Sequence, residues 1–375
     1  MVTRSISQIK NKKSTPGYNL WPFTDVNELH AGFSDVELEA LCDWKLKRYD
    51  RKLPYKSAHA MYWPAELYSF GRCYREWLKL PSWAPLPIYG DHGISISGCL
   101  AKHEAEAKPK VFITWDKKRA DLLQATTTKK VLQIQHPWVT FRKEKKLTRK
   151  PNAKGTLVFY AHSNDGIEIR NYDWDKYFDE LGRLPKEYHP LVLCMHRHDI
   201  KKGYHHKIRK FGLPIVSAGE STSPYFVERF YDIVTSFKFA TSNFGGSELF
   251  YCEEVGVPYF LMGKPPKKYN LEHDQLPKGL MVPRDDHAKF LEETKRDLFT
   301  QFPPESSAEK AQFLVNTLGL NIDNEQSSLK LKKLLAVEYC RHFPAILLNI
   351  LITLIRAYIP IKLIPIVRKY LTNER

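Results

Sequence analysis

The chain has 375 residues, a formal net charge of +16 and 43% hydrophobic residues, including 8 Trp, 20 Tyr and 20 Phe. This apolar and aromatic content excludes an intrinsically disordered protein. The length exceeds that of a typical single domain, so we expect two domains. The net charge indicates an anionic partner, which is a nucleic acid, an anionic membrane or a phosphorylated substrate.

Sequence motifs exclude some of these possible partners and some kinds of metal or disulfide site. The six cysteines are widely spaced, without a CxxC pair, so neither a zinc finger nor a disulfide framework is indicated and a reducing compartment fits best. No helix-turn-helix or RNP pattern is present, so nucleic acid is not expected as a partner. Residues 1–20 are expected to form a flexible arm, without the apolar region of a signal peptide.

The first predicted domain covers residues 21–142 and mixes helix and strand patterns. Helical patterns cover 35–50 and 64–80, and β-rich runs cover 85–90, 110–115 and 130–135. Residues 143–154 contain six basic residues and one proline, a composition typical of an interdomain linker.

The second predicted domain, residues 155–326, alternates between strand and helix. The predicted strands lie within 155–162, 189–196, 213–219, 238–243 and 258–263. Alternation at this spacing predicts a doubly wound parallel sheet. The expected fold class is therefore α/β, with two Rossmann-like domains facing a cleft and ligands bound at the carboxyl ends of the strands.

Residues 327–375 are expected to form an amphipathic helical tail. They carry nine Lys/Arg and two acidic residues, and the apolar run 343–355 is shorter than the roughly 20 residues that a membrane span needs. A short apolar helix with basic flanks is typical of an anchor on an anionic leaflet. We therefore expect a cytoplasmic protein held peripherally on the inner face of the plasma membrane. A packing helix and a tilted span are the alternatives.

The run Thr241–Gly263 carries the most informative pattern. A predicted strand ends at Asn243, Gly245 and Gly246 follow, and a helix is expected to begin at Ser247. The amide groups and dipole of a helix N-terminus attract anions, and glycines let a phosphate approach closely. An ordinary strand-to-helix turn with a serine cap is the alternative.

This run resembles the donor-nucleotide motif of the GT-B glycosyltransferases, especially those encoded in bacterial capsule and O-antigen clusters. Gly246, Ser247, Gly256 and Pro258 match that motif. In this family a Gly-Ser pair opens a helix on the phosphates of a nucleotide sugar, and the helix ends in G-x-P. An acidic residue of the helix often holds the ribose, which leaves Glu253 and Glu254 as alternatives.

Polar or small residues also follow the other predicted strands of this domain. Arg197 suits a phosphate clamp because its guanidinium fork matches phosphate oxygens. Each of these residues taken alone has a structural role as its alternative. With the resemblance, the expected donor-binding residues are His162, Ser163, Asn164, Arg197, Ser217, Gly219, Asn243, Gly245, Gly246, Ser247, Glu248, Glu253 and Glu254.

The residues that bind the acceptor and remove its proton are expected in the first domain. Asp91 and His92 lie on a glycine-flanked loop after a predicted strand, where either could act as the base of an inverting transfer. A turn in which Asp91 caps the next helix is the alternative. His136 ends the last strand of this domain and is expected either to contact the acceptor or to occupy a turn or cis-proline position.

Two metal-like patterns are interpreted as structural. Asp173-Trp174-Asp175 spells DxD but begins a helix, so Asp173 is expected to be its N-cap. Tyr204-His205-His206 is interpreted as the solvated face of a Lys-rich helix. No metal or other cofactor is therefore expected, and no GxGxxG or Walker pattern is present.

The predicted function is a metal-independent glycosyltransferase of surface polysaccharide biosynthesis, for example of capsule, O-antigen or lipopolysaccharide. It would move a sugar from a nucleotide sugar to a lipid-linked or glycan acceptor, and its activity would survive EDTA. The alternatives are a polyol-phosphate transferase or nucleotide-sugar epimerase on the same fold, and a non-catalytic, membrane-peripheral scaffold.

Overall fold

The computed structural model describes residues 25–42, 67–82, 84–91, 93–94, 105, 107–163, 167–221, 223–270, 282–283, 297–344, 346–348 and 351. Contacts divide the chain into two compact units, each built from segments that are far apart in the sequence. Unit 1 takes its described residues from Met1–Asp43, Arg142–Ser221 and Tyr225–Leu320, and unit 2 from Trp44–Phe141, Thr222–Pro224 and Asn321–Arg375. The predicted arm, His92 and Asn164 lie outside the described residues.

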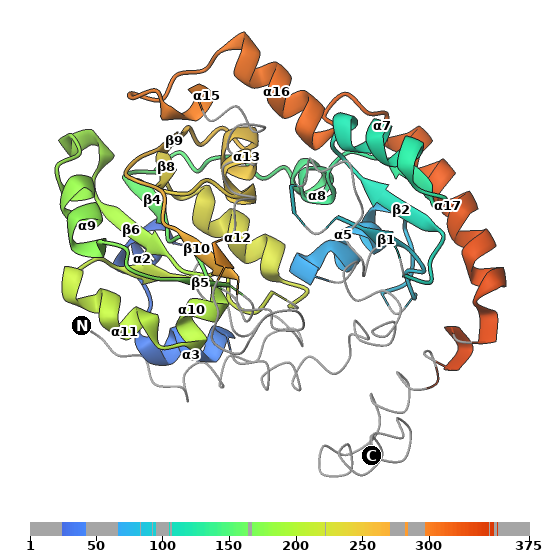
Figure 1. Ribbon diagram of the computed structural model, residues 1–375, viewed down its shortest axis with the longest axis horizontal. Helices are drawn as coiled ribbons and strands as arrows, with labels where there is room; N and C mark the ends of the chain where they lie inside the picture. The colour runs from blue at the N-terminus through green and yellow to red at the C-terminus, as the bar shows by residue number, and fades with distance from the viewer. Residues whose placement is uncertain are drawn as a thin grey trace. The chain divides into compact units, whose positions relative to one another are not determined.

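Unit 1 is built on a five-stranded parallel sheet with the order β7-β6-β4-β8-β9 (Figure 1). The strands are β4 (Thr156–Phe159), β6 (Leu191–Cys194), β7 (Ile215–Val216), β8 (Phe239–Ser242) and β9 (Tyr259–Leu261). All five predicted strands of this domain are present. The chain winds outward from β4 through β6 to β7, then crosses to β8, so the sheet is doubly wound with its switch point between β4 and β8.

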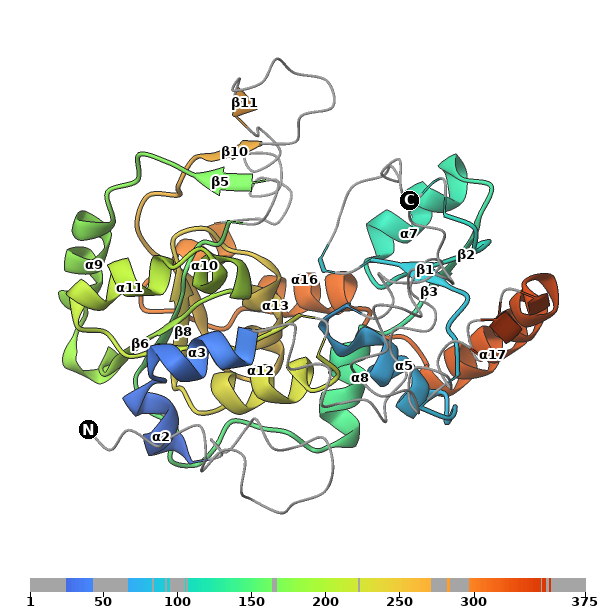
Figure 2. The same cartoon turned by 90° about the horizontal axis from the view of Figure 1, so that it is seen from below.

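Helices cover both faces of this sheet, which explains why its strands are continuously apolar. Figure 2 shows α9, α10 and α11 on one side and α12 and α13 on the other. The helices of unit 1 are α2 (Val26–Ala31), α3 (Asp35–Cys42), α9 (Trp174–Gly182), α10 (Arg197–Lys201), α11 (Tyr204–Ile208), α12 (Phe226–Val234), α13 (Ser247–Glu254), α15 (Asp297–Thr300) and α16 (Ala308–Leu318), with short 3-10 turns η3 (Lys186–Tyr188) and η4 (Arg209–Phe211).

Local signals account for two helix boundaries in unit 1. The Asp173 carboxylate accepts the Lys176 N–H at 2.9 Å and caps α9, which confirms the structural interpretation of the DxD pattern. The sequence predicts one helix as far as Lys210, but Gly203 adopts a left-handed φ of 72° and separates α10 from α11. Glycine reaches this conformation without the steric cost that other residues meet.

A small antiparallel sheet in unit 1 was not predicted. Its order is β11-β10-β5, with β5 (Ile167–Ile169), β10 (Lys268–Asn270) and β11 (Val282–Pro283). Figure 2 shows it to one side of the five-stranded sheet.

Unit 2 contains a three-stranded parallel sheet in the order β1-β2-β3. The strands are β1 (Tyr89–Gly90), β2 (Val111–Thr114) and β3 (Lys130–Gln133), and the helices are η2 (Leu67–Ser69), α5 (Phe70–Trp77), α7 (Lys117–Thr126), most of α8 (Pro137–Glu144) and α17 (Asn324–Arg341). The described strands follow one another across the sheet in the same order as in the sequence. They therefore do not show the doubly wound arrangement that was predicted for this domain.

Helix α17 overlaps the predicted tail and packs against unit 2 along one face. Leu331, Leu335 and Glu338 are buried, and the Glu338 carboxylate accepts the Lys110 N–H at 3.2 Å. Beyond this helix, Phe343, Leu347, Leu348 and Leu351 are exposed. Among the described residues, no helix is both long enough and apolar enough to cross a membrane.

Candidate functional site

The carboxyl ends of the unit 1 strands bring together most of the residues predicted to bind a donor. Strands β4 and β8 are neighbours, with Phe159 paired to Ser242, so the loops that follow them start side by side. Ligands of doubly wound sheets bind in the crevice at such a switch point. We call residues 160–163, 195–202 and 243–248 the strand-end site.

The turn after β8 is organised by Ser242. Its hydroxyl oxygen accepts the N–H of Phe244 at 3.2 Å and of Gly245 at 2.8 Å, and the Tyr259 hydroxyl at 2.7 Å. Burial raises the pKa of Tyr259 well above its ordinary value, so its hydroxyl remains a proton donor. Gly245 has a left-handed φ of 64°, which completes the turn and lets α13 begin at Ser247.

The N-terminus of α13 attracts negative charge. The N-cap residue is Gly246, which has no side chain that could cap the helix. The first N–H groups of any helix lack hydrogen-bond partners within that helix. The Gly246 N–H donates instead to the Glu248 carboxylate at 2.8 Å. Glu248 thus places a carboxylate where the helix dipole favours an anion.

Asn243 lies next to this helix start and has an unsatisfied side chain. It is 1% exposed, and neither its amide nitrogen nor its oxygen makes a hydrogen bond of ordinary geometry within the described structure. The Tyr172 hydroxyl donates to the Lys264 carbonyl at 2.6 Å, and its oxygen is also within weak hydrogen-bonding reach of the Asn243 side chain. Because buried polar groups almost always make hydrogen bonds of good geometry, this weakly bonded amide at a strand end indicates a ligand contact.

The loop after β4 is tied to the segment after β6 by a buried polar network. The Ser163 N–H and hydroxyl both donate to Asp199, at 3.1 and 2.8 Å, and the Lys202 ammonium donates to the Ser163 oxygen at 3.1 Å. Asp199 and Lys202 were not predicted as site residues. Lys202 brings a positive charge to the strand-end site.

Three imidazoles stack in a row at the same strand ends. The His162 and His196 rings lie 4.5 Å apart, and the His196 and His198 rings 5.1 Å apart. Imidazole N–H groups can donate hydrogen bonds, so this row can contact an anionic ligand. Cys194 is adjacent, but burial raises its pKa to about 12 and keeps the thiol neutral.

Arg197, predicted as a phosphate clamp, is paired within the protein. Its Nη1 lies 2.9 Å from the buried Glu220 carboxylate, and the Lys201 ammonium lies 3.2 Å from the same group. The Arg197 Nε is buried and makes no hydrogen bond within the described structure. Phosphate binding by Arg197 remains a prediction, and Glu220 partly neutralises its charge.

Ser217 and Gly219 have structural contacts after β7. The Ser217 hydroxyl accepts the Gly219 N–H at 3.0 Å, and the next N–H, of Glu220, donates to the Leu41 carbonyl at 3.0 Å. Gly219 has a φ of 81°, and a side chain there would meet the Leu41 oxygen at 2.7 Å. This glycine therefore allows α3 to approach the loop.

Gly219→Ala should destabilise the protein more than Gly256→Ala. Both glycines have nearly the same left-handed φ, 81° and 82°, but nothing lies within 4 Å of a side chain built on Gly256. In both variants, alanine in the left-handed conformation costs about 1–2 kcal/mol. In Gly219→Ala, overpacking against Leu41 adds about 1–3 kcal/mol. Urea unfolding measures the difference, and equal losses would contradict the close approach.

Glu253 and Glu254 lie at the opposite end of α13 from the glycine turn. Glu253 pairs with Lys310 at 2.7 Å, and Glu254 accepts from Arg142 at 2.8 Å. Burial raises the pKa of both carboxyl groups, and these cations partly offset the rise. Because both carboxylates are engaged there, their contacts give no support to a ribose-binding role.

Two of the acceptor-side candidates, Asp91 and His136, are buried. Asp91 forms a two-oxygen ion pair with Arg119, with three contacts of 2.8–2.9 Å, and also accepts the Thr114 hydroxyl at 2.7 Å. These contacts stabilise the carboxylate as a structural anion. The base role of Asp91 finds no support in them.

His136 is completely buried among aromatic rings. Its ring lies 4.4 Å from that of Trp115 and 5.5 Å from that of Phe70, and its Nδ1 accepts the Trp138 N–H at 3.2 Å. Burial lowers its pKa well below the ordinary value, so it is neutral. The peptide bond to Pro137 is trans, so the cis-proline alternative is wrong and the turn at the start of α8 is the observed role.

A pocket of about 850 Å³ lies elsewhere in unit 1. It is lined in part by Phe178, His189, Pro190 and Phe211, around the residues that precede and begin β6. This is the amino edge of the sheet, whereas doubly wound sheets bind ligands at the carboxyl edge. The strand-end site is therefore the stronger candidate.

Comparisons with known proteins give no family assignment. No protein-family model matches the chain, and no curated protein sequence matches it. A solved structure described as "Structure of the Wall Teichoic Acid Polymerase TagF" is similar, with 12% identity, coverage of 70% of each chain and a TM-score of 0.33. The fold class stated here, mixed α/β with parallel sheets, rests on the strand pairing alone.

Proposed function

We propose that this protein is a metal-independent glycosyltransferase that binds a nucleotide sugar at the strand-end site. The turn from Asn243 to Ser247 carries the proposal. It combines a buried amide without a hydrogen bond of ordinary geometry, two glycines and a helix N-terminus that already holds a carboxylate. This is the arrangement that a donor phosphate would need at a sheet switch point.

In the proposed reaction the protein stabilises the leaving nucleotide phosphate. The α13 N-terminus, Lys202 and His162 would supply partial or full positive charge to it as the glycosidic bond breaks. Glu248 must leave the Gly246 N–H when the phosphate arrives, because two anions would repel each other there. Of the two predicted bases, the Asp91–Arg119 ion pair favours His92 for removing the acceptor proton.

The proposed acceptor is either a lipid-linked molecule or a glycan of surface polysaccharide biosynthesis. The protein would meet this acceptor while it is bound to an anionic membrane. Support comes from the exposed apolar side chains at Phe343, Leu347, Leu348 and Leu351, and from the nine Lys/Arg of residues 327–375. Exposed apolar groups beside basic residues suit the interface of an anionic leaflet. This implies a peripheral position on the cytoplasmic face of the plasma membrane.

A thermal-stability panel tests the donor site. The purified protein is heated with CMP, UDP, GDP and dTDP, with their sugar conjugates, and with a CDP-linked polyol. A ligand that binds only the native state raises the melting temperature by mass action. We expect stabilisation by nucleotide sugars of one base. A shift with the CDP-polyol alone would favour the polyol-phosphate transferase, and no shift with any ligand would favour the scaffold.

A further inference from the structure

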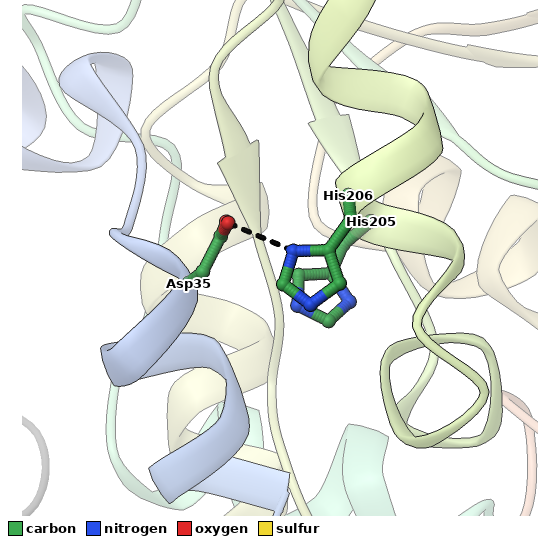
Figure 3. A group of neighbouring side chains, drawn as sticks. All are labelled: Asp35, His205 and His206. Carbon is green, nitrogen blue, oxygen red and sulfur yellow. Dashed lines mark hydrogen bonds and ion pairs between the residues drawn. The ribbon is translucent and has the colours of Figure 1, made fainter.

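Helices α3 and α11 bring four potential metal ligands together in unit 1. Asp35 and Glu39 are one turn apart on α3, and His205 and His206 are adjacent on α11. Figure 3 shows the Asp35 carboxylate directed at the His206 ring, with the His205 ring beside it. One ligand atom from each of Asp35, His205 and His206 lies within 4.8 Å of the others.

The Glu39 carboxylate lies close to both imidazoles. The Glu39 carboxylate oxygen lies 3.5 Å from the His205 Nε2 and 3.4 Å from the His206 Nε2. Metal–ligand bonds of 2.0–2.1 Å in a tetrahedron place neighbouring ligand atoms about 3.3–3.5 Å apart. The two distances from Glu39 to the imidazoles are therefore those of a tetrahedral metal shell.

His205 supplies an independent indication of a ligand. Its side chain is 1% exposed, its Nδ1 makes no hydrogen bond within the described structure, and its Nε2 has only the 3.5 Å approach of the Glu39 carboxylate. Buried imidazole nitrogens normally make close hydrogen bonds, and a metal ion between the Nε2 and Glu39 would replace this long contact with two short bonds.

Asp35 orients His206 from outside the proposed metal shell. Its Oδ2 lies 3.0 Å from the His206 Nδ1, while its Oδ1 accepts the Arg209 Nε–H at 3.0 Å. A carboxylate on the outer nitrogen of a metal-binding histidine fixes the tautomer and raises the basicity of the inner nitrogen. This contact directs the His206 Nε2 toward Glu39.

We propose that Glu39, His205 and His206 bind one divalent transition-metal ion, with Asp35 as the positioning residue. Zn²⁺ suits this set of two imidazoles and a carboxylate, and a water would take the fourth position. The sequence pattern was interpreted as a solvated helix face, which is wrong for the buried His205. The proposed ion joins α3 to α11, takes no part in the proposed transfer and does not depend on it.

Metal titration of the full chain tests the proposal. Protein stripped with a chelator and desalted is titrated with Co²⁺, and Zn²⁺ content is then measured after Zn²⁺ loading and desalting. We expect the visible absorption of tetrahedral Co²⁺ and one Zn²⁺ per chain. Glu39→Ala and His206→Ala should lose both, and Asp35→Asn should weaken binding about 10–100-fold.

Lys207→Ala is the matched control, because Lys207 is on the same helix and is not a ligand in the proposed site. It should bind metal like the wild type. Glu39 and His206 are 56% and 54% exposed, so their truncation removes little packing, and the melting temperature of the stripped variants verifies their folding. Absence of tetrahedral Co²⁺ bands in the wild type, or undiminished binding by folded His206→Ala, would overturn the proposal.

Discussion

Arg119→Ala is expected to lower the free energy of unfolding by about 3–5 kcal/mol, because it leaves the buried Asp91 carboxylate without its cation. Both side chains of this pair are only 2% exposed, and Arg119 contacts both oxygens of Asp91. The remaining Thr114 hydroxyl supplies one hydrogen bond but no charge. Equilibrium urea unfolding of the two proteins measures the loss.

Lys117→Ala on the same helix is the control for this prediction. Lys117 pairs with Asp121, but both side chains are 60% exposed, and a surface pair of this kind contributes about 0–1 kcal/mol. A loss with Arg119→Ala no larger than with Lys117→Ala would show that the buried pair does not stabilise unit 2.

Asp91→Asn separates the structural role of this carboxylate from the predicted base role. A structural anion should lose stability on this change while the folded variant keeps its kcat at low temperature. A general base contributes about 10²–10⁴-fold to the rate, so its loss would lower kcat by that factor in a stable variant. We expect the first result.

Gly246→Val should remove nucleotide stabilisation while the protein stays folded. Gly246 has extended backbone angles, φ −116° and ψ −158°, which valine adopts readily, and the closest group to its new side chain is the movable Glu248 carboxylate. At a ligand concentration 100 times Kd, binding stabilises by about 2.7 kcal/mol. A 100-fold loss of affinity would reduce this to about 0.4 kcal/mol. Melting curves with the ligand found in the panel measure both values.

Gly182→Val controls for the substitution itself. Gly182 ends α9, and nothing lies within 4 Å of a side chain built there. This variant should keep the full ligand-induced shift. Equal shifts in the Gly246 variant and the control would place the donor phosphate away from the α13 N-terminus.

The sequence was sufficient to predict the five strands of unit 1, because each is a short apolar run between helical patterns. It was insufficient where distant contacts decide the backbone. Among the described residues of the helix predicted at 64–80, α5 begins at Phe70, since Tyr68 and Ser69 take left-handed angles. The Tyr68 carbonyl accepts from Trp138, and the Ser69 hydroxyl donates to the Ser223 carbonyl.

The candidate site was predictable only in its local part. Asn243, Gly245 and Gly246 follow one another and share one turn, so their pattern is visible in the chain. The partners Asp199 and Glu220 were missed because they meet Ser163 and Arg197 across 36 and 23 positions. A position at the end of a strand also does not show whether a side chain faces a ligand or binds another residue of the protein. Asp91 lies at such a position and binds Arg119.

The interleaving of the two units has a consequence for synthesis. The chain leaves unit 1 after Asp43, returns at Arg142, and enters unit 2 for the last time at Asn321. The Glu220 N–H needs the Leu41 carbonyl, and the Lys110 N–H needs the carboxylate of Glu338 in α17. A domain made of one continuous segment can fold as it leaves the ribosome. Here α3 must wait for the loop after β7, and the sheet of unit 2 must wait for α17, so neither unit is completed by one continuous segment of the chain.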